Sequence, residues 1–354
     1  MKPSLIIVGA GVAGLAAGRA LADSGWRVTI VEKSRGVGGR LATRREGDAR
    51  FDHGAQYIKA PDGPLRALVE GTLDSDGSPA YDIGRPVWTF DTTGQISEGD
   101  TTQNADAKWC WRGGVNVLAK ALARGLTVRH EVEITRVAAQ AGGGYALFDT
   151  SGSVVDVADK VLLTAPAPQS AAIVAASDIA VELRTQLLNE LAQARYRRCI
   201  SLTFAYTARP AVPWYALVNS DRAHPISWLA CEHDKHGHAA AGQALLTAQM
   251  AHDWSMAHWD EAARGSFPAG SMPPYVQQVE RLCRQLLPDS PGELLWANVQ
   301  RWRYALPDSG ANCAALNGTE SGLYFAGDYC VGQGRVHLAI ENGWQVADMM
   351  EQQA

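Results

Sequence analysis

The chain has 354 residues, of which 46% are hydrophobic and 19% charged, and its formal net charge is -5 at pH 7. A chain of this length corresponds to roughly two domains and can form a stable core without disulfide bonds. The mild acidity and the lack of a long cationic run argue against a nucleic-acid-binding protein, and the hydrophobic content argues against disorder. The 6 cysteines are scattered without a CxxC pair, which is typical of isolated thiols in a reducing compartment.

The N-terminal segment predicts one βαβ unit. Leu5–Val8 is a strand buried on both faces, Val12–Ser24 is a helix ended by Gly25, and Arg27–Glu32 is a second strand. The apolar start is not a signal peptide, because it lacks a charged n-region and is interrupted by glycines. No stretch is long enough to span a bilayer, so we expect a soluble, cytoplasmic protein.

The rest of the chain alternates between helical and strand patterns, with a turn-rich insertion from Asp62 to Gln103. Helices are predicted at Trp111–Gly125, Ala171–Ala194, Leu245–Trp259, Pro274–Leu287 and Arg335–Gln352. Strands are predicted at Val87–Phe90, Thr127–Val137, Tyr145–Asp149, Lys160–Thr164, Cys199–Tyr206, Trp214–Asn219, Ile226–Cys231, Trp296–Tyr304 and Leu323–Ala326. Thr127–Val137 and Tyr145–Asp149 alternate like antiparallel strands.

The turn after the first strand reads Gly9-Ala10-Gly11-Val12-Ala13-Gly14. Gly9 permits the tight turn, Gly11 lets a pyrophosphate approach the backbone, and Gly14 lets the helix pack close to the strand. Glu32 ends the second strand at the distance expected for a carboxylate that binds the adenosine ribose. Alone, such a turn also fits a glycine-rich packing turn, and Glu32 also fits an ordinary surface carboxylate; strand and helix on either side favour the dinucleotide.

Two further segments extend this pattern. Lys33–Arg40 (KSRGVGGR) offers Gly39 amides and the Arg40 guanidinium to a second phosphate, although a glycine-rich surface loop fits as well. Near the C-terminus, Gly327-Asp328 follows a strand and precedes the last helix, whose first amides belong to Val336 and His337. A helix N-terminus stabilises an anion.

The string from GxGxxG through Glu32 to GGR resembles the FAD-binding pattern of amine-oxidase and glutathione-reductase-like flavoproteins, with Gly18 where that pattern more often has Ala. The whole chain resembles the renalase family, particularly its bacterial branch. The segments that carry the resemblance are Lys33–Arg40, Asp52–Tyr57 (DHGAQY), Thr164–Gln169 (TAPAPQ), Ser227–Ala230 (SWLA), Trp254-Ser255 with His258, Arg301–Tyr304 (RWRY) and Gly327–Cys330 (GDYC).

The resemblance implies an α/β fold with a Rossmann-like FAD domain and an interleaved α+β substrate domain. The FAD domain is expected at residues 1–60, 106–165 and 296–354, and the substrate domain at 61–105 and 166–295. FAD is expected to bind non-covalently, without a bond to Cys313. Its expected ligands are Gly9, Gly11, Val12, Ala13, Gly14, Glu32, Lys33, Gly39, Arg40, Gln56, Val132, Ala165, Gly327, Asp328 and Val336.

The resemblance also implies an oxidase of 2- or 6-dihydro-NAD(P) isomers, in which hydride passes to flavin N5 and molecular oxygen is reduced to hydrogen peroxide. Such a hydride transfer needs no protein base, so the side chains would position the reactants. Residues expected at the flavin or substrate are Gln56, Tyr57, Trp228 with Trp214, and Tyr304. For each, a packing role is the alternative, and His258 is expected to be structural.

The loop after Trp228 departs from the family. Cys231, His233, His236 and His238 are competent zinc ligands, but their spacing matches no compact zinc module, so we expect no metal. The alternatives to the renalase-like activity are an amine or other small-molecule oxidase, a non-catalytic flavin redox sensor and an NAD-dependent dehydrogenase. An amine oxidase would need an aromatic cage and a buried lysine, and the lysines lie outside the expected pocket segments.

Overall fold

The computed structural model describes residues 2–353, and their contacts fall into two units. Unit 1 contains the residues up to Leu41, Leu118–Tyr196 and the residues from Leu306 onward. Unit 2 contains Ala42–Val117 and Arg197–Ala305.

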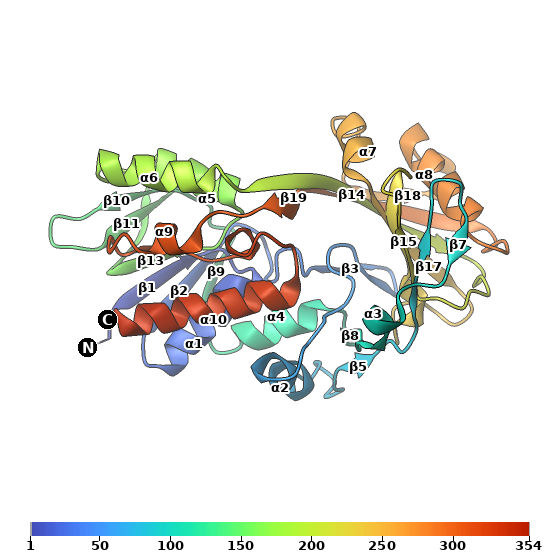
Figure 1. Ribbon diagram of the computed structural model, residues 1–354, viewed down its shortest axis with the longest axis horizontal. Coiled ribbons are helices and arrows are strands. Elements are labelled where there is room, and N and C mark those ends of the chain that lie inside the picture. Colours follow the sequence, from blue (N-terminus) through green and yellow to red (C-terminus); the bar gives the residue numbers. More distant parts are fainter. Residues whose placement is uncertain (1, 354) are drawn as a thin grey trace. The chain divides into compact units, whose positions relative to one another are not determined.

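Unit 1 is built on a parallel sheet in the order β20-β13-β1-β2-β9 (Figure 1). The strands are β1 (Ser4–Val8), β2 (Arg27–Glu32), β9 (Thr127–His130), β13 (Lys160–Leu163) and β20 (Leu323–Phe325). Short, almost continuous apolar runs such as those of β1 and β13 suit strands buried on both faces. The predicted Rossmann-like α/β class is confirmed.

Two helices from opposite ends of the chain lie side by side in unit 1 (Figure 1): α1 (Val12–Asp23) and α10 (Val336–Gln352). Their close approach depends on Gly343, because a Cβ there would lie 2.4 Å from the Ala13 carbonyl oxygen. The remaining elements of unit 1 are an antiparallel sheet and short helices: β10 (Ile134–Ala139), β11 (Tyr145–Asp149), β12 (Val154–Ala158), α5 (Ala167–Ala175), α6 (Val181–Leu191), α9 (Cys313–Asn317) and η3 (Asp328–Cys330).

Unit 2 is built on a sheet in the order β18-β19-β14-β17-β16-β15-β6-β7. Its strands are β6 (Val87–Phe90), β7 (Ile96–Ser97), β14 (Arg195–Tyr206), β15 (Ala216–Asn219), β16 (Ile226–Cys231), β17 (Ala244–Met250), β18 (Gly265–Pro268) and β19 (Leu294–Ser309). Apolar side chains of one face, such as Leu229, Leu246 and Ala248, share a core with Val276 and Val279 of α8 (Pro274–Gln285). Burial of this face stabilises unit 2.

The other elements of unit 2 are short: α2 (Pro64–Gly71), α3 (Thr101–Ala105), α7 (His252–Ala257), β3 (Thr43–Glu46), β4 (Ala49–Asp52), β5 (Tyr81–Asp82), β8 (Trp109–Cys110), η1 (Glu232–Asp234) and η2 (Ala269–Ser271). Helix α4 (Asn116–Ala123) and strands β14 and β19 have residues in both units.

Four predicted elements differ from the structure. The helix predicted at Leu245–Trp259 is wrong at its start, which is the central strand β17. Ala171–Ala194 is two helices, α5 and α6, and the helix predicted at Trp111–Gly125 begins only at Asn116. Thr127–Val137 is divided between β9, which pairs in parallel with β2, and the antiparallel β10. A short apolar run can form a strand or a helix, so its conformation depends on whether neighbouring strands pair with it.

The two units also divide the chain at residues other than the expected domain limits. Residues 166–196 belong to unit 1, whereas 42–60, 106–117 and 296–305 belong to unit 2. Helices α5 and α6 explain the first difference, since Ile173, Val174 and Leu187 share a core with strands of the parallel sheet. The assignment of a cofactor domain and a substrate domain stays a prediction.

Candidate functional site

The glycine-rich turn of unit 1 has one packed side and one open side. Gly9 has φ +111° and donates its N–H to the Val31 carbonyl at 2.8 Å. A Cβ on Gly14 would lie 2.4 Å from the Gly9 carbonyl oxygen, whereas a Cβ on Gly11 would meet nothing within 4 Å. The N-terminus of α1, which starts with Val12 and Ala13, receives no side-chain cap. Space and amide donors therefore lie together at Gly11.

The Thr164 side chain holds this turn in place, a role that the GxGxxG motif does not indicate. Its hydroxyl lies 3.0 Å from the Val8 carbonyl oxygen and 2.9 Å from that of Gly9. A Cβ on Gly9 would come within 2.8 Å of the same hydroxyl. Ala165, an expected cofactor ligand, follows directly and is half-buried, and its carbonyl accepts from Ser170 Oγ at 2.9 Å.

Glu32 is held at the carboxyl end of β2, only 9% exposed. Its two carboxylate oxygens accept from the Ala10 and Ser34 amides at 2.8 and 2.7 Å. Its carbonyl accepts from the Val132 amide at 3.1 Å. Lys33 points instead toward Glu133 at the surface, 3.5 Å away. The Glu32 carboxylate thus ties the first glycine turn to the loop that follows β2.

The two glycine-rich loops contact each other. The Gly38 N–H donates to the Ala10 carbonyl at 2.8 Å, and Gly11 and Gly38 form a parallel bridge. A Cβ on Gly39, whose φ is +55°, would lie 3.7 Å from the Gly11 Cα. Both backbones can therefore approach one diphosphate.

Arg40 and Asp328, proposed separately from opposite ends of the sequence, form a bidentate ion pair. The two guanidinium–carboxylate distances are 2.5 and 2.9 Å, and the Tyr196 hydroxyl donates to the same carboxylate at 3.0 Å. Burial by itself lowers the pKa of Arg40, but Asp328 and Tyr196 together outweigh it and the pKa is raised. Burial next to Asp328 also raises the pKa of Tyr196.

The Gly327–Asp328 turn is anchored by the last helix. Gly327 has φ +149°, and its N–H donates to Asn342 Oδ1 of α10 at 2.9 Å. α10 begins at Val336 and His337, and no side chain caps its N-terminus. The expected cofactor ligands of unit 1 therefore gather around the ends of β1, β2 and β20, and this donor set fits a dinucleotide.

Unit 2 carries a cluster of three aromatic rings, Tyr57, Tyr215 and Trp228, which we call the aromatic cluster. The ring centroids lie 6.3 Å apart for Tyr57–Tyr215, 6.3 Å for Tyr57–Trp228 and 6.5 Å for Tyr215–Trp228. Two of its members were predicted to face the substrate; Tyr215 was missed, although it directly follows Trp214 in the sequence. Such rings present planar apolar faces.

Two buried polar atoms beside the aromatic cluster lack partners in the described part of the chain. They are the Gln56 side-chain carbonyl oxygen Oε1 and the Trp228 indole Nε1. The Gln56 Nε2 amide is occupied, since it donates to the Asp52 carbonyl. One acceptor and one donor are therefore available, and leaving such groups buried and unpaired is costly.

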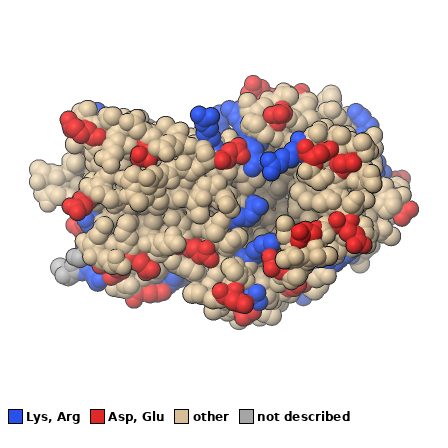
Figure 2. Space-filling view, in the orientation of Figure 1, with Lys and Arg blue, Asp and Glu red and all other residues tan. Residues whose placement is uncertain are grey.

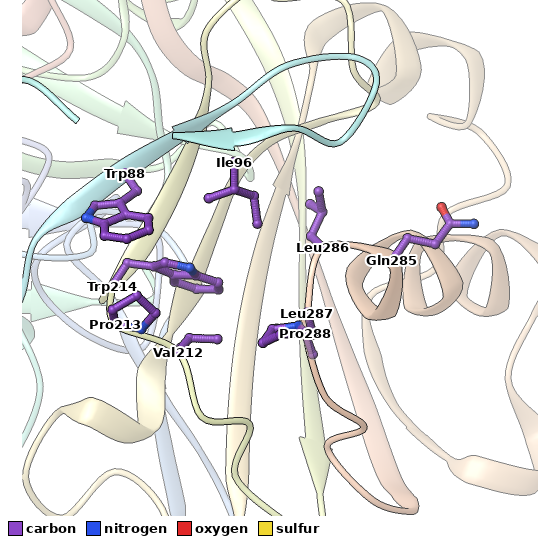
Figure 3. A pocket seen from close by; sticks show the side chains of 9 residues that line it. All are labelled: Trp88, Ile96, Val212, Pro213, Trp214, Gln285, Leu286, Leu287 and Pro288. Carbon is purple, nitrogen blue, oxygen red and sulfur yellow. The ribbon is translucent and has the colours of Figure 1, made fainter. Parts of the chain in front are cut away.

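Trp214 does not join Trp228. It is 1% exposed, belongs to the core that packs on α8, and lines an apolar pocket of about 360 Å³ with Trp88, Ile96 and Leu286 (Figure 3). Tyr304 is half-buried on β19, so its role stays a prediction. The His258 ring lies tilted against Trp254 with centroids 4.1 Å apart and contacts Glu261, and its structural role stays a prediction.

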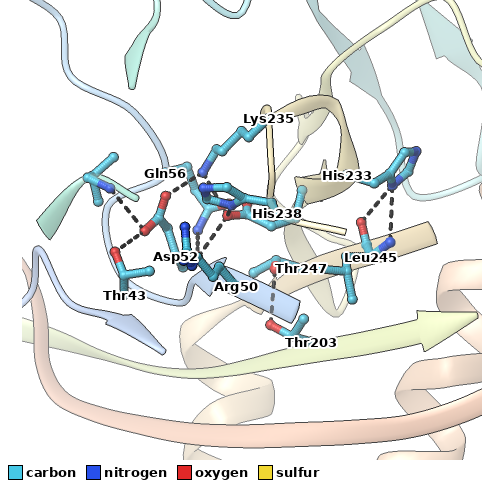
Figure 4. A network of polar contacts seen from close by, with 12 residues as sticks. Thr43, Arg50, Asp52, Gln56, Thr203, His233, Lys235, His238, Leu245 and Thr247 are labelled. Carbon is cyan, nitrogen blue, oxygen red and sulfur yellow. Dashed lines mark hydrogen bonds and ion pairs between the residues drawn. The ribbon is translucent and has the colours of Figure 1, made fainter. Parts of the chain in front are cut away.

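Unit 2 also contains a fully buried ionic network (Figure 4). Lys235 Nζ lies 2.7 Å from Asp52 Oδ2 and 2.9 Å from Glu232 Oε1, and His238 Nδ1 lies 2.9 Å from the same Glu232 oxygen. Burial raises the pKa of Glu232, but the Lys235 charge and the hydrogen bonds from His238 and Lys235 together outweigh it and lower that pKa to about 2. Lys235 Nζ also lies 6.0 Å from the Tyr215 ring centroid.

The suggested zinc ligands do not converge in the structure. Cys231 is part of the apolar core, His233 Nδ1 contacts the Leu245 backbone at 2.9 Å, and His236 stacks on Tyr81 at the surface. Among the described residues, Asp52, Glu232 and His238 place ligand atoms within 4.8 Å of one another. The Lys235 ammonium already bonds both carboxylates of that group, so a cation is in place without a metal.

Acidic and basic side chains are interspersed on the face shown in Figure 2. Neither sign forms a continuous area there, which agrees with the balanced composition. Over residues 2–353, no helix combines the length and hydrophobicity needed to cross a membrane.

Two family models match this chain: an NAD(P)-binding Rossmann-like domain at residues 7–71 and flavin containing amine oxidoreductase at residues 81–350. Protein anon-37Cs of Drosophila melanogaster is 28% identical over 130 residues, 36% of this chain and 24% of that protein. The L-glutamate oxidase precursor of Streptomyces diastatochromogenes is 44% identical over 62 residues, 17% of this chain and 9% of that protein. The chain thus matches at most about a quarter of these curated relatives.

The fold is shared with cyclohexylamine oxidase from Brevibacterium oxydans IH-35A, with a TM-score of 0.69 and 15% sequence identity. That alignment covers 99% of this chain and 100% of the oxidase. At this identity the likeness shows the fold alone.

Proposed function

The chain belongs to the flavin containing amine oxidoreductase family, and from this premise we propose that it is an FAD-dependent oxidase of a small molecule. When bound, FAD supplies a hydride acceptor and passes the electrons to molecular oxygen. The observation that carries the proposal is the meeting of the Gly9–Gly14 turn, Glu32 and the Arg40–Asp328 pair in unit 1.

Each of these groups has a defined task toward the cofactor. The Gly11 backbone and the uncapped α1 N-terminus bind the diphosphate, and Glu32 accepts hydrogen bonds from the adenosine ribose. Arg40 and Asp328 hold the two glycine-rich ends of the site together. The α10 N-terminus at Val336 favours negative charge on the bound ring system.

For the substrate we propose a dihydronicotinamide dinucleotide isomer, either 2- or 6-dihydro-NAD(P), which yields NAD(P)+ and hydrogen peroxide. The support comes from unit 2: the aromatic cluster offers faces for a planar ring, and its neighbours offer one unpartnered acceptor, Gln56 Oε1, and one unpartnered donor, Trp228 Nε1. A carboxamide carries the complementary donor and acceptor, so both buried atoms gain a partner.

An amine is the second candidate substrate. Cyclohexylamine oxidase has the same fold, and the structure contains the two features that an amine oxidase was expected to need: a three-ring cluster and a buried lysine, Lys235, which the sequence had not placed in a pocket segment. Lys235 is, however, bound in two ion pairs. A protonated amine also lacks an acceptor for the Trp228 N–H.

The test is anaerobic mixing of the purified holoenzyme with 2- and 6-dihydro-NAD(P) and with a panel of amines, followed by flavin absorbance. We expect rapid bleaching by a dihydronicotinamide isomer and slow or no bleaching by the amines. The reverse result would replace the substrate proposal by the amine alternative. If no reductant bleaches the flavin, the alternative of a non-catalytic redox sensor would be favoured.

Trp228→Phe keeps a ring and removes only the N–H donor. We expect the apparent Kd for the dihydronicotinamide substrate to rise about tenfold, because the carboxamide oxygen loses its donor. Trp254→Phe is the matched control, since its buried Nε1 is also unpartnered in the described chain but lies on α7. Equal effects of the two substitutions would show that Trp228 does not bind the substrate.

A further inference from the structure

Unit 1 contains a pair of half-buried cysteines that the oxidase reaction does not use. Cys313 is the first residue of α9, and Cys330 ends the η3 turn that begins at Asp328. Both sulfur atoms lie near the Phe325 carbonyl oxygen, at 3.9 and 3.8 Å, and both cysteines line one pocket. The two sulfur atoms are therefore neighbours although 17 positions separate them in the sequence.

The pair lines a pocket of about 210 Å³ formed with α9 and α10. Among its other lining residues are Asn317, Asn342 and Met349. A pocket of this size admits a small solute. By contrast, Cys110, Cys231 and Cys283 are buried in unit 2.

The surroundings of Cys313 favour its thiolate form. Asn317 Nδ2 lies 3.1 Å and Asn342 Nδ2 3.8 Å from its sulfur. The Cys330 thiol lowers the pKa of Cys313 to about 7, against the opposing effect of burial and with help from the two amides. The neighbouring Cys313 thiol, together with burial, raises the pKa of Cys330. One sulfur is thus prepared as a nucleophile and its neighbour remains a thiol.

We propose that Cys313 and Cys330 form a peroxide-reactive dithiol site that closes to a disulfide. The Cys313 thiolate attacks one oxygen of hydrogen peroxide, the O–O bond breaks and hydroxide leaves, so sulfur is oxidised to a sulfenic acid and the peroxide is reduced. The Cys330 sulfur then attacks the sulfenic sulfur, the S–S bond forms, the S–O bond breaks, and water leaves with the Cys330 proton. The proposal goes beyond the oxidase reaction and holds for peroxide from any source.

The pair is connected to the candidate cofactor site through Asn342. The Asn342 Nδ2 amide faces Cys313, while its Oδ1 atom accepts from the Gly327 N–H at 2.9 Å. Oxidation of Cys313 therefore acts on the same asparagine side chain that fixes the Gly327–Asp328 turn.

The experiment treats reduced, desalted holoenzyme with hydrogen peroxide in about tenfold excess and maps the cysteines by mass spectrometry. We expect two thiols per chain to disappear, a Cys313–Cys330 disulfide to form, and dithiothreitol to restore both thiols. In Cys330→Ser, we expect Cys313 to be trapped by dimedone as its sulfenic acid adduct. In Cys313→Ser, we expect thiol loss to be slower by about tenfold or more.

Cys199→Ser is the matched control, because Cys199 is also half-buried but burial raises its pKa to about 12. It should behave as the wild type. An unchanged thiol count in the wild type, or oxidation of Cys199 as fast as that of Cys313, would overturn the proposal. The wild-type map decides the question even if a serine variant fails to fold, and it does not depend on oxidase activity.

Discussion

The ion pair between Arg40 and Asp328 shows how a single contact joins distant parts of the chain. Its partners are 288 positions apart, and the Asp328 side chain is only 4% exposed. Burying a carboxylate without a cation costs much free energy, so the charge of each residue offsets the burial cost of the other. This mutual dependence makes the pair a sensitive point for both stability and cofactor retention.

Asp328→Asn removes the charge and keeps the shape. We expect the free energy of unfolding of the apoprotein to fall by about 2 kcal/mol, because Arg40 loses a charged acceptor. FAD affinity, measured by fluorescence titration, should fall as well. Asp23→Asn is the control: it breaks the exposed Arg19 pair on α1, whose separation is 3.4 Å, and such a pair is worth about 0.5 kcal/mol at most. Equal losses in the two variants would contradict the account.

His53 gives a pH dependence with a defined sign. Burial lowers the pKa of His53 to about 3, with the nearby Arg44 acting in the same direction. The unfolded chain takes up this proton below about pH 6.5 while the folded chain does not, so folding stability is lost as the pH falls from about 6.5 toward 3.

His53→Phe keeps a ring for stacking on Trp302, where the centroids are 5.2 Å apart. Denaturant titrations at several pH values should show that the variant loses less stability than the wild type below about pH 6.5, by up to about 1.4 kcal/mol per pH unit. His236→Phe, at an exposed site, should parallel the wild type. Parallel curves for His53→Phe and the wild type would contradict the lowered pKa.

At the scale of elements, the N-terminus of α1 contains a glycine, Gly11, that folding does not require. Gly11 has φ -72° and ψ 169°, an extended conformation that alanine adopts easily, and an added Cβ meets no atom of the chain within 4 Å. The absence of a side chain at Gly11 is therefore not required by the fold. We propose that a bound diphosphate occupies this space.

Gly11→Ala should leave the apoprotein folded, with a loss of about 1 kcal/mol or less in unfolding free energy. FAD affinity should fall by about 2 kcal/mol, roughly thirtyfold, because the methyl group occupies the diphosphate position. The control is Gly71→Ala at the end of α2, where a Cβ also meets open space. If Gly11→Ala binds FAD like the wild type, the diphosphate does not lie there.

Local patterns predicted some elements fully and others not at all. The bounds of β2, β6 and β16 match the predictions, because alternation and flanking turns define these strands locally. Strand β17 was predicted as the start of a helix, since its apolar run gains its meaning only from its partners β14 and β16. Long-range pairing is not encoded in a short window.

The candidate site divides in the same way. The glycines, Glu32, Arg40 and Asp328 stand in motifs with fixed spacing, so the sequence proposes them as cofactor ligands. Tyr215 and Lys235 act through partners far away in the chain and carry no local signal, and the contact of Thr164 with the glycine turn is formed only by the fold. The Cys313–Cys330 pair is likewise formed only by the fold.

At the scale of the whole molecule, the two units carry different chemistry. Unit 1 contains backbone amides and the Arg40–Asp328 pair, as a dinucleotide requires, and unit 2 contains the aromatic cluster and a buried ionic network. We propose that unit 2 determines the substrate, whereas the class of reaction depends on the flavin. The proposed function therefore rests on the cofactor.

The most direct measurement is the chromophore released by heat denaturation of freshly purified protein, identified by chromatography and mass spectrometry and quantified per chain. We predict one FAD per chain in the supernatant, absent from a Gly11→Ala preparation or reduced in it. A colourless supernatant, together with apoprotein that takes up no FAD on titration, would contradict the account.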